Sequence, residues 1–372
     1  MKAYIIYERL FDSQGEFLLV GGIETYLMSL AKVFLSNGIQ PEIIQKASKN
    51  FVKTIDGIKI RGFKIRRKTY KNLYKSIATE INEADFVVWG LDRCAVPIPH
   101  ERTISIQHGI PFDYYQIEKK SRQWFYKLGL GRLLKTIQRR NAIKAFETAK
   151  YKVCVDYNFW NWYRTYCMPN DESNIYIIPN FAKVDVAPNQ NHKDDKIKVV
   201  FARRFVRMRG IEAMLKVAAH YHNNKNVEIT FAGEGPFLPE IESLKSFDSS
   251  ITITKYSPEE SIQFHKQFDI AIVPSVASEG TSLSLLEAMS AGTAVIATYV
   301  GGMTNIIIDG YNGLFVRPNS HKEIIYAIDR LASDRELLET LSRNGVETVK
   351  NSFSFETWSL RWTSLINDIL SK

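Results

Sequence analysis

Residues 270–292 read IAIVPSVASEGTSLSLLEAMSAG and carry the clearest fold signal in the sequence. The apolar run Ile270–Val273 has the length of a buried strand and ends at a proline. A polar loop follows, and apolar periodicity predicts a helix over Leu283–Ser290, with Ser282 placed to cap its free N–H groups. Strand, loop and helix in this order form the repeating unit of a parallel α/β sheet.

The same unit recurs on both sides of this stretch. Helices are predicted at Ile23–Ser36, with Gly38 as its left-handed cap, and at Ile211–His222 and Glu259–Gln267. The other predicted strands are Ala3–Tyr7, Glu42–Gln45, Phe86–Trp89, Thr103–Gln107, Val153–Val155, Tyr176–Ile178, Lys198–Ala202, Glu228–Ala232, Thr252–Lys255 and Ala294–Ala297. We therefore predict an α/β protein with parallel sheets and right-handed crossovers.

The chain of 372 residues is too long for one ordinary core. The polar segment Ala187–Asp195 has the composition of a linker. We expect an N-terminal Rossmann-like domain over residues 1–190, a second such domain over 191–350 and a C-terminal helix over 351–372 that crosses back to the first domain. Ligands of such sheets bind at the carboxyl ends of the strands, so we expect the two domains to face a central cleft.

Composition and charge limit the classes of partner. The N-terminal apolar run is too short for a signal peptide, no run approaches a transmembrane span, and Cys94, Cys154 and Cys167 lack metal spacing, which favours a cytoplasmic location. Of the net charge of +9, residues 1–190 carry 29 Lys and Arg against 18 Asp and Glu, and the remainder 20 against 22. The basic stretches Lys59–Lys75 and Lys119–Lys152 fit an anionic membrane surface, nucleic acid or a solvated face. Neither resembles a nucleic-acid module, so nucleic acid is not expected as a partner.

Two glutamates flank a predicted phosphate site. Glu279 lies in the loop before the helix Leu283–Ser290, and Glu287 lies in its second turn. The amides near the helix start can donate to a diphosphate, and the carboxylates on either side can accept from sugar hydroxyls. The amides in question belong to Gly280, Thr281, Ser282 and Leu283. Alone, this spacing is weak evidence, because a surface glutamate and an amphipathic helix produce it too.

A second candidate is the basic turn Phe201–Gly210, FARRFVRMRG, between a strand and a helix. Arg204 and Arg209 can clamp a diphosphate and the charge that grows on a leaving group. The alternative is a solvated basic turn, and we assign Arg203 and Arg207 to that ordinary class.

The first half offers two weaker signals. Gly21 and Gly22 precede the first long helix, where glycines let backbone approach a ligand. No G-x-G-x-x-G fingerprint follows the first strand, which argues against a dehydrogenase. His108 ends the strand Thr103–Gln107 and is expected to face the cleft; a structural loop histidine is the alternative.

Several of these motifs together resemble the donor half of retaining GT-B glycosyltransferases of family 4. They are Pro274-Ser275, Glu279-Gly280, Glu287–Met289, and the runs GTAVIAT, YVGG and DGYNGLFVRP between residues 292 and 318. The resemblance implies that Glu287 holds the nucleotide ribose and that Glu279 lies against the transferred sugar. Arg204 and Arg209 match the family's arginine and lysine, and Arg203 replaces its glycine.

The resemblance extends to residues outside these runs. It implies that Gly21, Gly22 and Gly233 approach the donor, that His108 acts near the transferred sugar, and that Asn180 belongs to a Pro-Asn pair ending the first domain. Tyr256, after the third strand of the second half, is the candidate for lining the base pocket.

The implied function is retaining transfer of a sugar from a nucleoside-diphosphate sugar to a glycan or lipid-linked acceptor, in bacterial surface polysaccharide or lipopolysaccharide synthesis. The sequence contains no D-x-D motif, so neither a metal nor a cofactor is expected. We expect a hexosyltransferase at the inner face of the cell membrane. The alternatives are another GT-B enzyme, such as a nucleotide-sugar epimerase or phosphorylase, and a non-catalytic basic protein that binds nucleic acid or membrane.

Overall fold

The computed structural model describes residues 1–19, 21–65, 69–110, 112, 120–184 and 196–372. The chain divides into two compact units. The first comprises Met1–Ile178 together with Trp358–Lys372, and the second comprises Pro179–Thr357. The division thus falls at Ile178, and the predicted linker Ala187–Asp195 lies outside the described residues.

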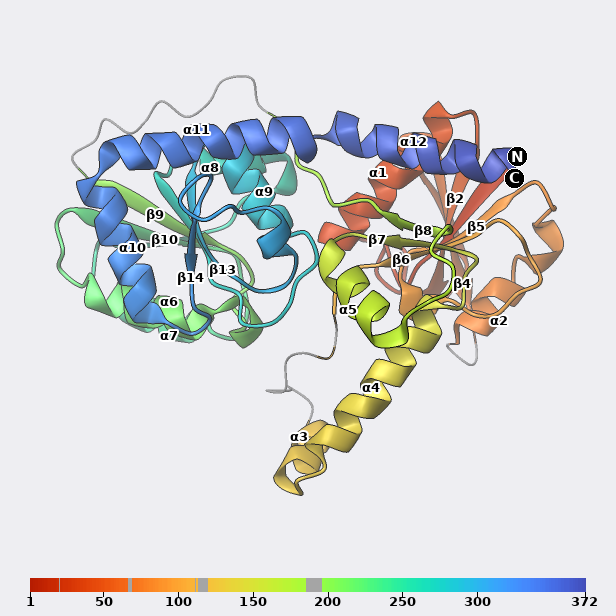
Figure 1. Ribbon diagram of the computed structural model, residues 1–372, viewed down its shortest axis with the longest axis horizontal. Coiled ribbons are helices and arrows are strands. Elements are labelled where there is room, and N and C mark those ends of the chain that lie inside the picture. The colour runs from red at the N-terminus through yellow and green to blue at the C-terminus, as the bar shows by residue number, and fades with distance from the viewer. Residues whose placement is uncertain (20, 66–68, 111, 113–119, 185–195) are drawn as a thin grey trace. The chain divides into compact units, whose positions relative to one another are not determined.

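The first unit is built on a sheet in the order β3-β4-β2-β1-β5-β6-β7-β8 (Figure 1). Its strands are β1 Lys2–Ile6, β2 Gln40–Ala47, β3 Phe51–Ile55, β4 Ile58–Lys64, β5 Phe86–Trp89, β6 Thr103–Gln107, β7 Tyr151–Cys154 and β8 Ile175–Ile177. Its helices are α1 Gly22–Ser36, α2 Tyr70–Lys75, α3 Lys120–Lys127, α4 Gly131–Phe146 and α5 Tyr157–Cys167, with the turns η1 Ala78–Glu80 and η2 Asp92–Cys94. All strand pairs are parallel except β3 with β4.

The antiparallel β3–β4 edge was not predicted. In β4 the alternate residues Ile58, Ile60 and Gly62 are buried, which is the period of a half-buried strand. Lys59 and Arg61 lie between these buried residues, so the sequence alone indicates a basic stretch here rather than a strand. In the structure the Arg61 guanidinium lies 3.2 Å from a Glu42 carboxylate oxygen and 2.6 Å from one of Glu80, so this cation is neutralised within the unit.

The C-terminal helix α12, Phe355–Ser371, packs on the first unit. Trp358 and Trp362 are buried, and the Trp358 ring lies edge-on to Tyr26 of α1 at 5.1 Å between centroids. The Trp362 Nε1 donates a hydrogen bond of 3.1 Å to the Tyr26 hydroxyl. The predicted return of this helix to the first domain is confirmed, because residues from Trp358 onward cluster with that unit.

The second unit has a parallel sheet in the order β11-β10-β9-β12-β13-β14. Its strands are β9 Ile197–Ala202, β10 Val227–Ala232, β11 Ile251–Thr254, β12 Ile270–Val273, β13 Ala294–Thr298 and β14 Leu314–Val316. Its helices are α6 Ile211–His220, α7 Leu238–Lys245, α8 Ser261–His265, α9 Leu283–Ser290, α10 His321–Ser333 and α11 Arg335–Ser352, with the turns η3 Arg207–Arg209, η4 Pro258–Glu260 and η5 Gly301–Asn305.

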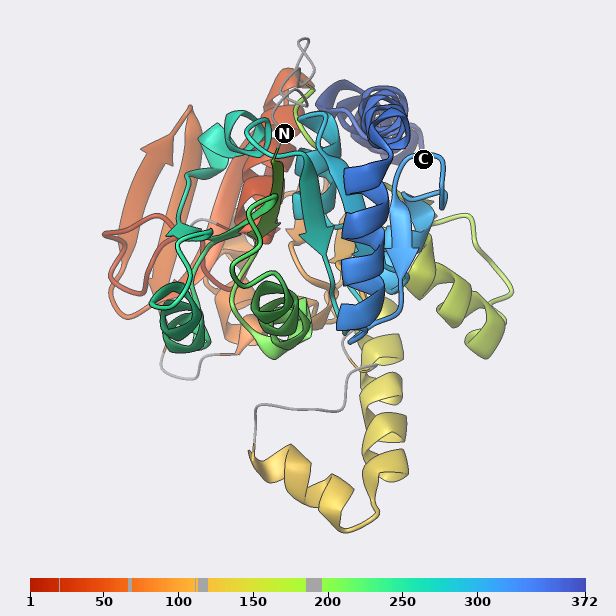
Figure 2. The same cartoon turned by 90° about the vertical axis from the view of Figure 1, so that its left-hand side faces the viewer.

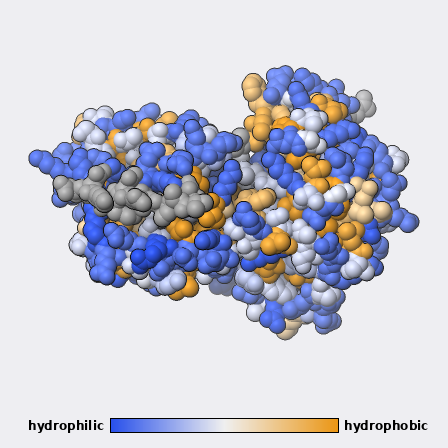
Figure 3. All heavy atoms as spheres, turned by 90° about the horizontal axis from the view of Figure 1, so that it is seen from above, coloured by the Kyte–Doolittle hydropathy of each residue, from blue (hydrophilic) through white to orange (hydrophobic). Residues whose placement is uncertain are grey.

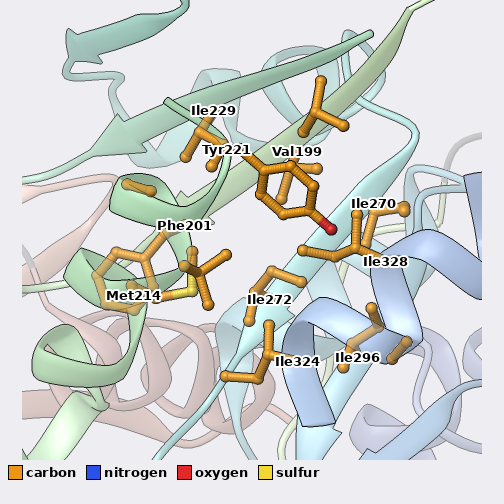
Figure 4. Packing of buried hydrophobic residues seen from close by; sticks show 14 of the residues in the cluster. Val199, Phe201, Met214, Tyr221, Ile229, Ile270, Ile272, Ile296, Ile324 and Ile328 are labelled. Atoms are coloured by element: carbon orange, nitrogen blue, oxygen red, sulfur yellow. The ribbon is translucent and has the colours of Figure 1, made fainter. Parts of the chain in front are cut away.

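Successive strand residues of this second sheet point to opposite faces and enter two separate cores. Val199 and Phe201 pack with α6 and α10, together with Ile229, Ile270 and Ile272 (Figure 4). The intervening residues, such as Val200 and Ala271, pack with α9. Both faces are therefore buried, as the continuous apolar strands of a parallel sheet require.

The helices α3 and α4 extend away from the first sheet as a helical arm (Figure 1, Figure 2). Over the face seen in Figure 3, hydrophilic residues prevail and apolar residues are scattered. Among the described residues, no helix is both long enough and apolar enough to cross a membrane.

Candidate functional site

The candidate site of the second unit lies at the carboxyl ends of β9 and β12. The basic turn after β9 and the loop after β12 are held together at Gly210, whose φ is +81°. A Cβ on Gly210 would lie 1.9 Å from the Pro274 carbonyl oxygen, so only glycine permits this approach. The Val276 amide donates to the Met208 carbonyl at 3.0 Å, which fixes the two segments in register.

Arg203 and Glu279 form the centre of this site. The Arg203 guanidinium is buried and donates through Nη2 to both Glu279 carboxylate oxygens, at 2.6 and 2.7 Å. Its Nη1 donates to the Ser275 hydroxyl at 2.5 Å, and that hydroxyl donates to Glu279 Oε1. This is a buried ion pair whose charges are also hydrogen-bonded, the condition under which burial of charge is tolerated.

Arg209 is the second cation on the same carboxylate. Its Nη1 lies 2.5 Å from Glu279 Oε2, and a quarter of its side chain remains exposed. Burial acts to raise the pKa of Glu279, but the charges of Arg203 and Arg209, with hydrogen bonds from Arg203 and Ser275, outweigh it and lower the pKa to about 2. Glu279 is thus an anion at any physiological pH. Arg204, the other predicted clamp residue, is exposed and is not brought to Glu279.

The predicted phosphate loop is packed closely against its neighbours. A Cβ on Gly301 would lie 2.2 Å from the Glu279 carbonyl oxygen. A Cβ on Gly302 would lie 2.7 Å from the Gly280 carbonyl carbon. The Gly302 amide donates to the Glu279 carbonyl at 2.8 Å, and Asn180 Nδ2 donates to the Thr281 carbonyl at 2.7 Å. The two glycines of the YVGG run and Asn180 therefore shape the loop.

The helix α9 begins at Leu283, as predicted. Ser282 has the extended backbone of an N-cap and is buried, but its side chain makes no capping hydrogen bond. Its hydroxyl lies 3.3 Å from that of Ser284 instead. A capping side chain normally accepts a hydrogen bond from one of the first N–H groups of a helix. Because Ser282 does not, the first N–H groups of α9 can donate to another partner.

Glu287 lies in the second turn of α9 in very different surroundings. Burial raises its pKa to about 7, and the neighbouring Ser261 hydroxyl opposes that rise. Burial raises the pKa of Tyr256, and the charge of Glu287 adds to the rise; the Tyr256 ring stacks on Phe264 at 4.3 Å between centroids. Gly233 has φ +147°, and a Cβ there would lie 2.3 Å from the Arg203 carbonyl oxygen.

Gly21, Gly22 and His108 belong to the first unit. Gly21 is the N-cap of α1 and Gly22 its first residue. Burial lowers the pKa of His108 to about 4, and its Nε2 donates to the Gly90 carbonyl at 3.1 Å, so the ring is neutral. Its ring lies edge-on to Tyr26 at 5.2 Å between centroids.

Within the second unit, Glu279 and Arg209 are thus in contact, and Asn180 donates a hydrogen bond to the loop that contains Gly280–Leu283. Sequence reasoning missed Arg203, Ser275 and Ser261. No sequence signal separated Arg203 from Arg204, because both faces of this sheet are buried and side-chain alternation along the strand does not select one of them. The Arg203 amide donates to the Ala232 carbonyl just past the end of β9, and Arg203 is buried whereas Arg204 is exposed. Over the described residues, no group of three His, Cys, Asp or Glu side chains could hold a metal ion.

Comparison with known proteins shows what the second unit is similar to. Residues 185–348 match the family model described as Glycosyl transferases group 1. Most of the second unit is thus similar to the group 1 glycosyltransferases. An uncharacterised glycosyltransferase of Methanocaldococcus jannaschii is 26% identical to the chain, over 69% of the chain and 65% of the relative. The chain spans still smaller shares, 43% and 44%, of two further glycosyltransferases of that organism.

Solved structures resemble the chain over both units. Sucrose-phosphate synthase from Thermosynechococcus elongatus aligns with a TM-score of 0.75 at 18% identity, over 100% of the chain and 99% of the synthase. The Anabaena HepE protein in complex with UDP-glucose aligns with a TM-score of 0.73 at 13% identity, over 99% and 100%. The GT-B fold expected from the sequence is confirmed.

Proposed function

We propose that this chain is a retaining glycosyltransferase that moves a sugar from a nucleoside-diphosphate sugar to a glycan or lipid-linked acceptor. The observation that carries the proposal is the arrangement at the start of α9. There the ionised Glu279, bound to Arg209, and the higher-pKa Glu287 flank the helix start. The backbone N–H groups of that helix start and the nearby cation suit a diphosphate.

The chemistry follows from these charges. Negative charge grows on the diphosphate as the glycosidic bond breaks, and Arg209 with the amides of the loop stabilises it. The acceptor hydroxyl attacks the anomeric carbon from the face that the diphosphate leaves and gives its proton to a departing phosphate oxygen, so the anomeric configuration is retained. No divalent metal is required in this scheme, because Arg209 supplies the positive charge. The complex of the HepE protein with UDP-glucose supports a nucleotide-sugar donor.

The donor is tested by a thermal-shift screen with UDP, GDP, dTDP and their hexose derivatives. A ligand at 100 times its Kd adds about 2.7 kcal/mol to the free energy of unfolding. The donor that stabilises the chain is then followed by NMR during transfer or slow hydrolysis, with and without EDTA. We expect a product that keeps the anomeric configuration of the donor and a rate that EDTA does not change. Absence of a shift with every nucleotide would refute the proposed donor.

We also propose that the chain attaches reversibly to the inner face of the cell membrane through the helical arm, α3 and α4. Five large apolar side chains of the arm are at least 42% exposed: Trp124, Leu128, Leu130, Leu133 and Ile137. The sequence from 120 to 146 carries eight Lys and Arg and no Asp or Glu. Exposed apolar residues among uncompensated cations suit an anionic lipid surface.

Co-sedimentation with liposomes tests this attachment. We expect binding to vesicles that contain anionic lipid, and a steep loss of binding with added salt. Changing the exposed Lys127, Arg132, Arg140 and Lys144 together to glutamate should abolish it and leave nucleotide affinity unchanged. Failure to bind anionic vesicles even at low salt would refute the membrane proposal and point to a soluble acceptor.

A further inference from the structure

The acceptor capacity of Glu279 is fully used in the structure. A carboxylate offers about four lone-pair positions. Oε1 accepts from Arg203 at 2.6 Å and from the Ser275 hydroxyl, while Oε2 accepts from Arg203 at 2.7 Å and contacts Arg209 at 2.5 Å. A sugar hydroxyl can therefore bind Glu279 only after one of these donors leaves.

The three donors differ in how easily they can leave. The Arg203 side chain is 5% exposed and Ser275 is fully buried, whereas the Arg209 side chain is 26% exposed. Withdrawing Arg203 would leave its own buried charge without a partner, which is costly. Arg209 can instead exchange one anion for another, because a phosphate is as good a partner for a guanidinium as a carboxylate is.

We propose that Arg203 is a positioning residue that fixes Glu279, and that Arg209 is exchanged between Glu279 and the donor diphosphate. The diphosphate draws Arg209 away, and the vacated Oε2 then accepts a hydroxyl of the transferred sugar. This inference rests on the proposed function, since it takes a nucleoside-diphosphate sugar as the ligand of this site.

The charge balance explains why Arg203 is needed. With both arginines in place the cluster carries one net positive charge. Once Arg209 turns to the diphosphate, Arg203 and Glu279 remain as a neutral pair, so Glu279 stays ionised and keeps its geometry. If position 203 were glycine, the departure of Arg209 would leave a buried carboxylate without a cation, and its pKa would rise. Recognition of the sugar is thereby made conditional on the diphosphate.

The test separates the affinity for the nucleotide from the contribution of the sugar. Calorimetry measures the Kd of UDP and UDP-glucose, or of whichever nucleotide and hexose donor the thermal-shift screen selects. The ratio of the two Kd values reports the sugar contribution. The variants are Arg203→Gly, Arg203→Lys and Arg209→Ala, and the control is Arg207→Ala, whose side chain is 59% exposed and pairs with Glu212.

Arg203→Gly should leave the Kd of the nucleoside diphosphate within about twofold and lower the sugar contribution about tenfold or more. The remaining sugar contribution should then fall as pH is lowered from 7 to 5, whereas that of the unchanged protein should be constant. Arg203→Lys should keep part of the sugar contribution that Arg203→Gly loses. Arg209→Ala should weaken the nucleoside diphosphate about tenfold or more and preserve the sugar contribution, because Oε2 is free from the start.

If Arg203→Gly weakened the binding of the nucleoside diphosphate and of the nucleotide sugar by the same factor, the positioning role would be overturned. A sugar contribution that vanishes in Arg209→Ala would overturn the exchange. If Arg203→Gly fails to fold, Arg203→Lys and Arg209→Ala still decide the question. Failure of the proposed function looks different, because the unchanged protein would then bind no nucleotide at all.

Discussion

Glu279 and Glu287 stand on one short loop–helix segment, yet their surroundings give them opposite properties. Glu279 precedes α9 and meets two guanidinium groups, and its pKa is lowered to about 2. Glu287 lies two turns further along, beside Ser261, and burial raises its pKa to about 7. Burial acts in the same direction on both carboxyl groups, so the difference arises from the arginines.

This difference separates two kinds of carboxylate in one motif. Glu279 is a permanent anion that organises cations, and its proton affinity is too low for it to exchange protons near neutral pH. Glu287 changes charge around neutral pH, so a ligand that hydrogen-bonds to its ionised form must also lower its pKa. The same residue type thus supplies a fixed charge at the loop and a responsive one on the helix.

The largest effect should come from removing the fixed charge. Glu279→Ala leaves the Arg203 guanidinium buried without its partner, and we expect the free energy of unfolding of the second unit to fall by about 3–5 kcal/mol. Urea denaturation followed by circular dichroism measures it. The control Glu234→Ala removes an exposed partner of Lys255 and should change nothing measurable. Equal stabilities of the two variants would mean that Arg203 does not depend on Glu279.

The two carboxyl groups should also change the free energy of unfolding with pH in opposite directions. The pKa of Glu287 is higher in the folded chain than its ordinary 4.5, so its contribution is present below pH 4.5 and is lost as pH rises to about 7, by roughly 3 kcal/mol. Glu279 contributes stability above pH 4.5 that is lost as pH falls toward 2.

Denaturation at pH 5, 6, 7 and 8 measures the upper slope. Glu287→Gln cannot ionise, so the decline between pH 5 and 7 should be smaller in this variant than in the unchanged protein. Identical pH profiles of the two proteins would show that Glu287 titrates normally and would remove the contrast with Glu279.

The sequence predicted the sheets better than the site. Each predicted strand is present to within two residues at either end, because buried parallel strands are continuous apolar runs. The edge strands β3 and β14 were missed, and so was β4, which lies next to β3. Charged residues alternate with apolar ones in β4, and β14 has three residues, too few to establish a period.

Within the site, spacing located the segments but not the side chains that meet. Motif spacing selected Arg204, whereas the structure directs Arg203 inward, because only a strand's register decides which of two neighbouring side chains enters the core. Ser275 reaches Glu279 from four residues earlier in the same loop, whereas Ser261 reaches Glu287 from another helix, and no apolar period marks either contact. Whether the predicted residues act on a donor stays a prediction.

Removing the responsive charge should weaken nucleotide binding. Glu287→Ala deletes the carboxylate expected to hold the ribose, and we expect a loss of about 1.5–3 kcal/mol in the binding free energy of the nucleoside diphosphate. Calorimetry at pH 8 measures it, with Glu240→Ala, exposed on α7, as the control. In the unchanged protein, the affinity for the nucleoside diphosphate should rise between pH 6 and 8 as Glu287 ionises. Unchanged affinity in Glu287→Ala would exclude the ribose role.

The smallest effect concerns the backbone that keeps Arg209 beside Glu279. Gly210 and Gly38 both have positive φ, +81° and +72°, but a Cβ would lie 1.9 Å from the Pro274 carbonyl oxygen at Gly210 and would meet nothing within 4 Å at Gly38. Gly38→Ala should therefore cost only the conformational penalty, about 1 kcal/mol. Gly210→Ala must also push the turn away from Pro274, which we expect to add roughly 1 kcal/mol.

Displacement of that turn should lengthen the Arg209–Glu279 contact and leave Glu287 untouched. Gly210→Ala should therefore reduce turnover while the pH dependence of stability between pH 5 and 7 stays that of the unchanged protein. Denaturation and donor turnover of both alanine variants measure this. Equal stability and turnover in Gly210→Ala and Gly38→Ala would show that the close approach to Pro274 does not hold Arg209 in place.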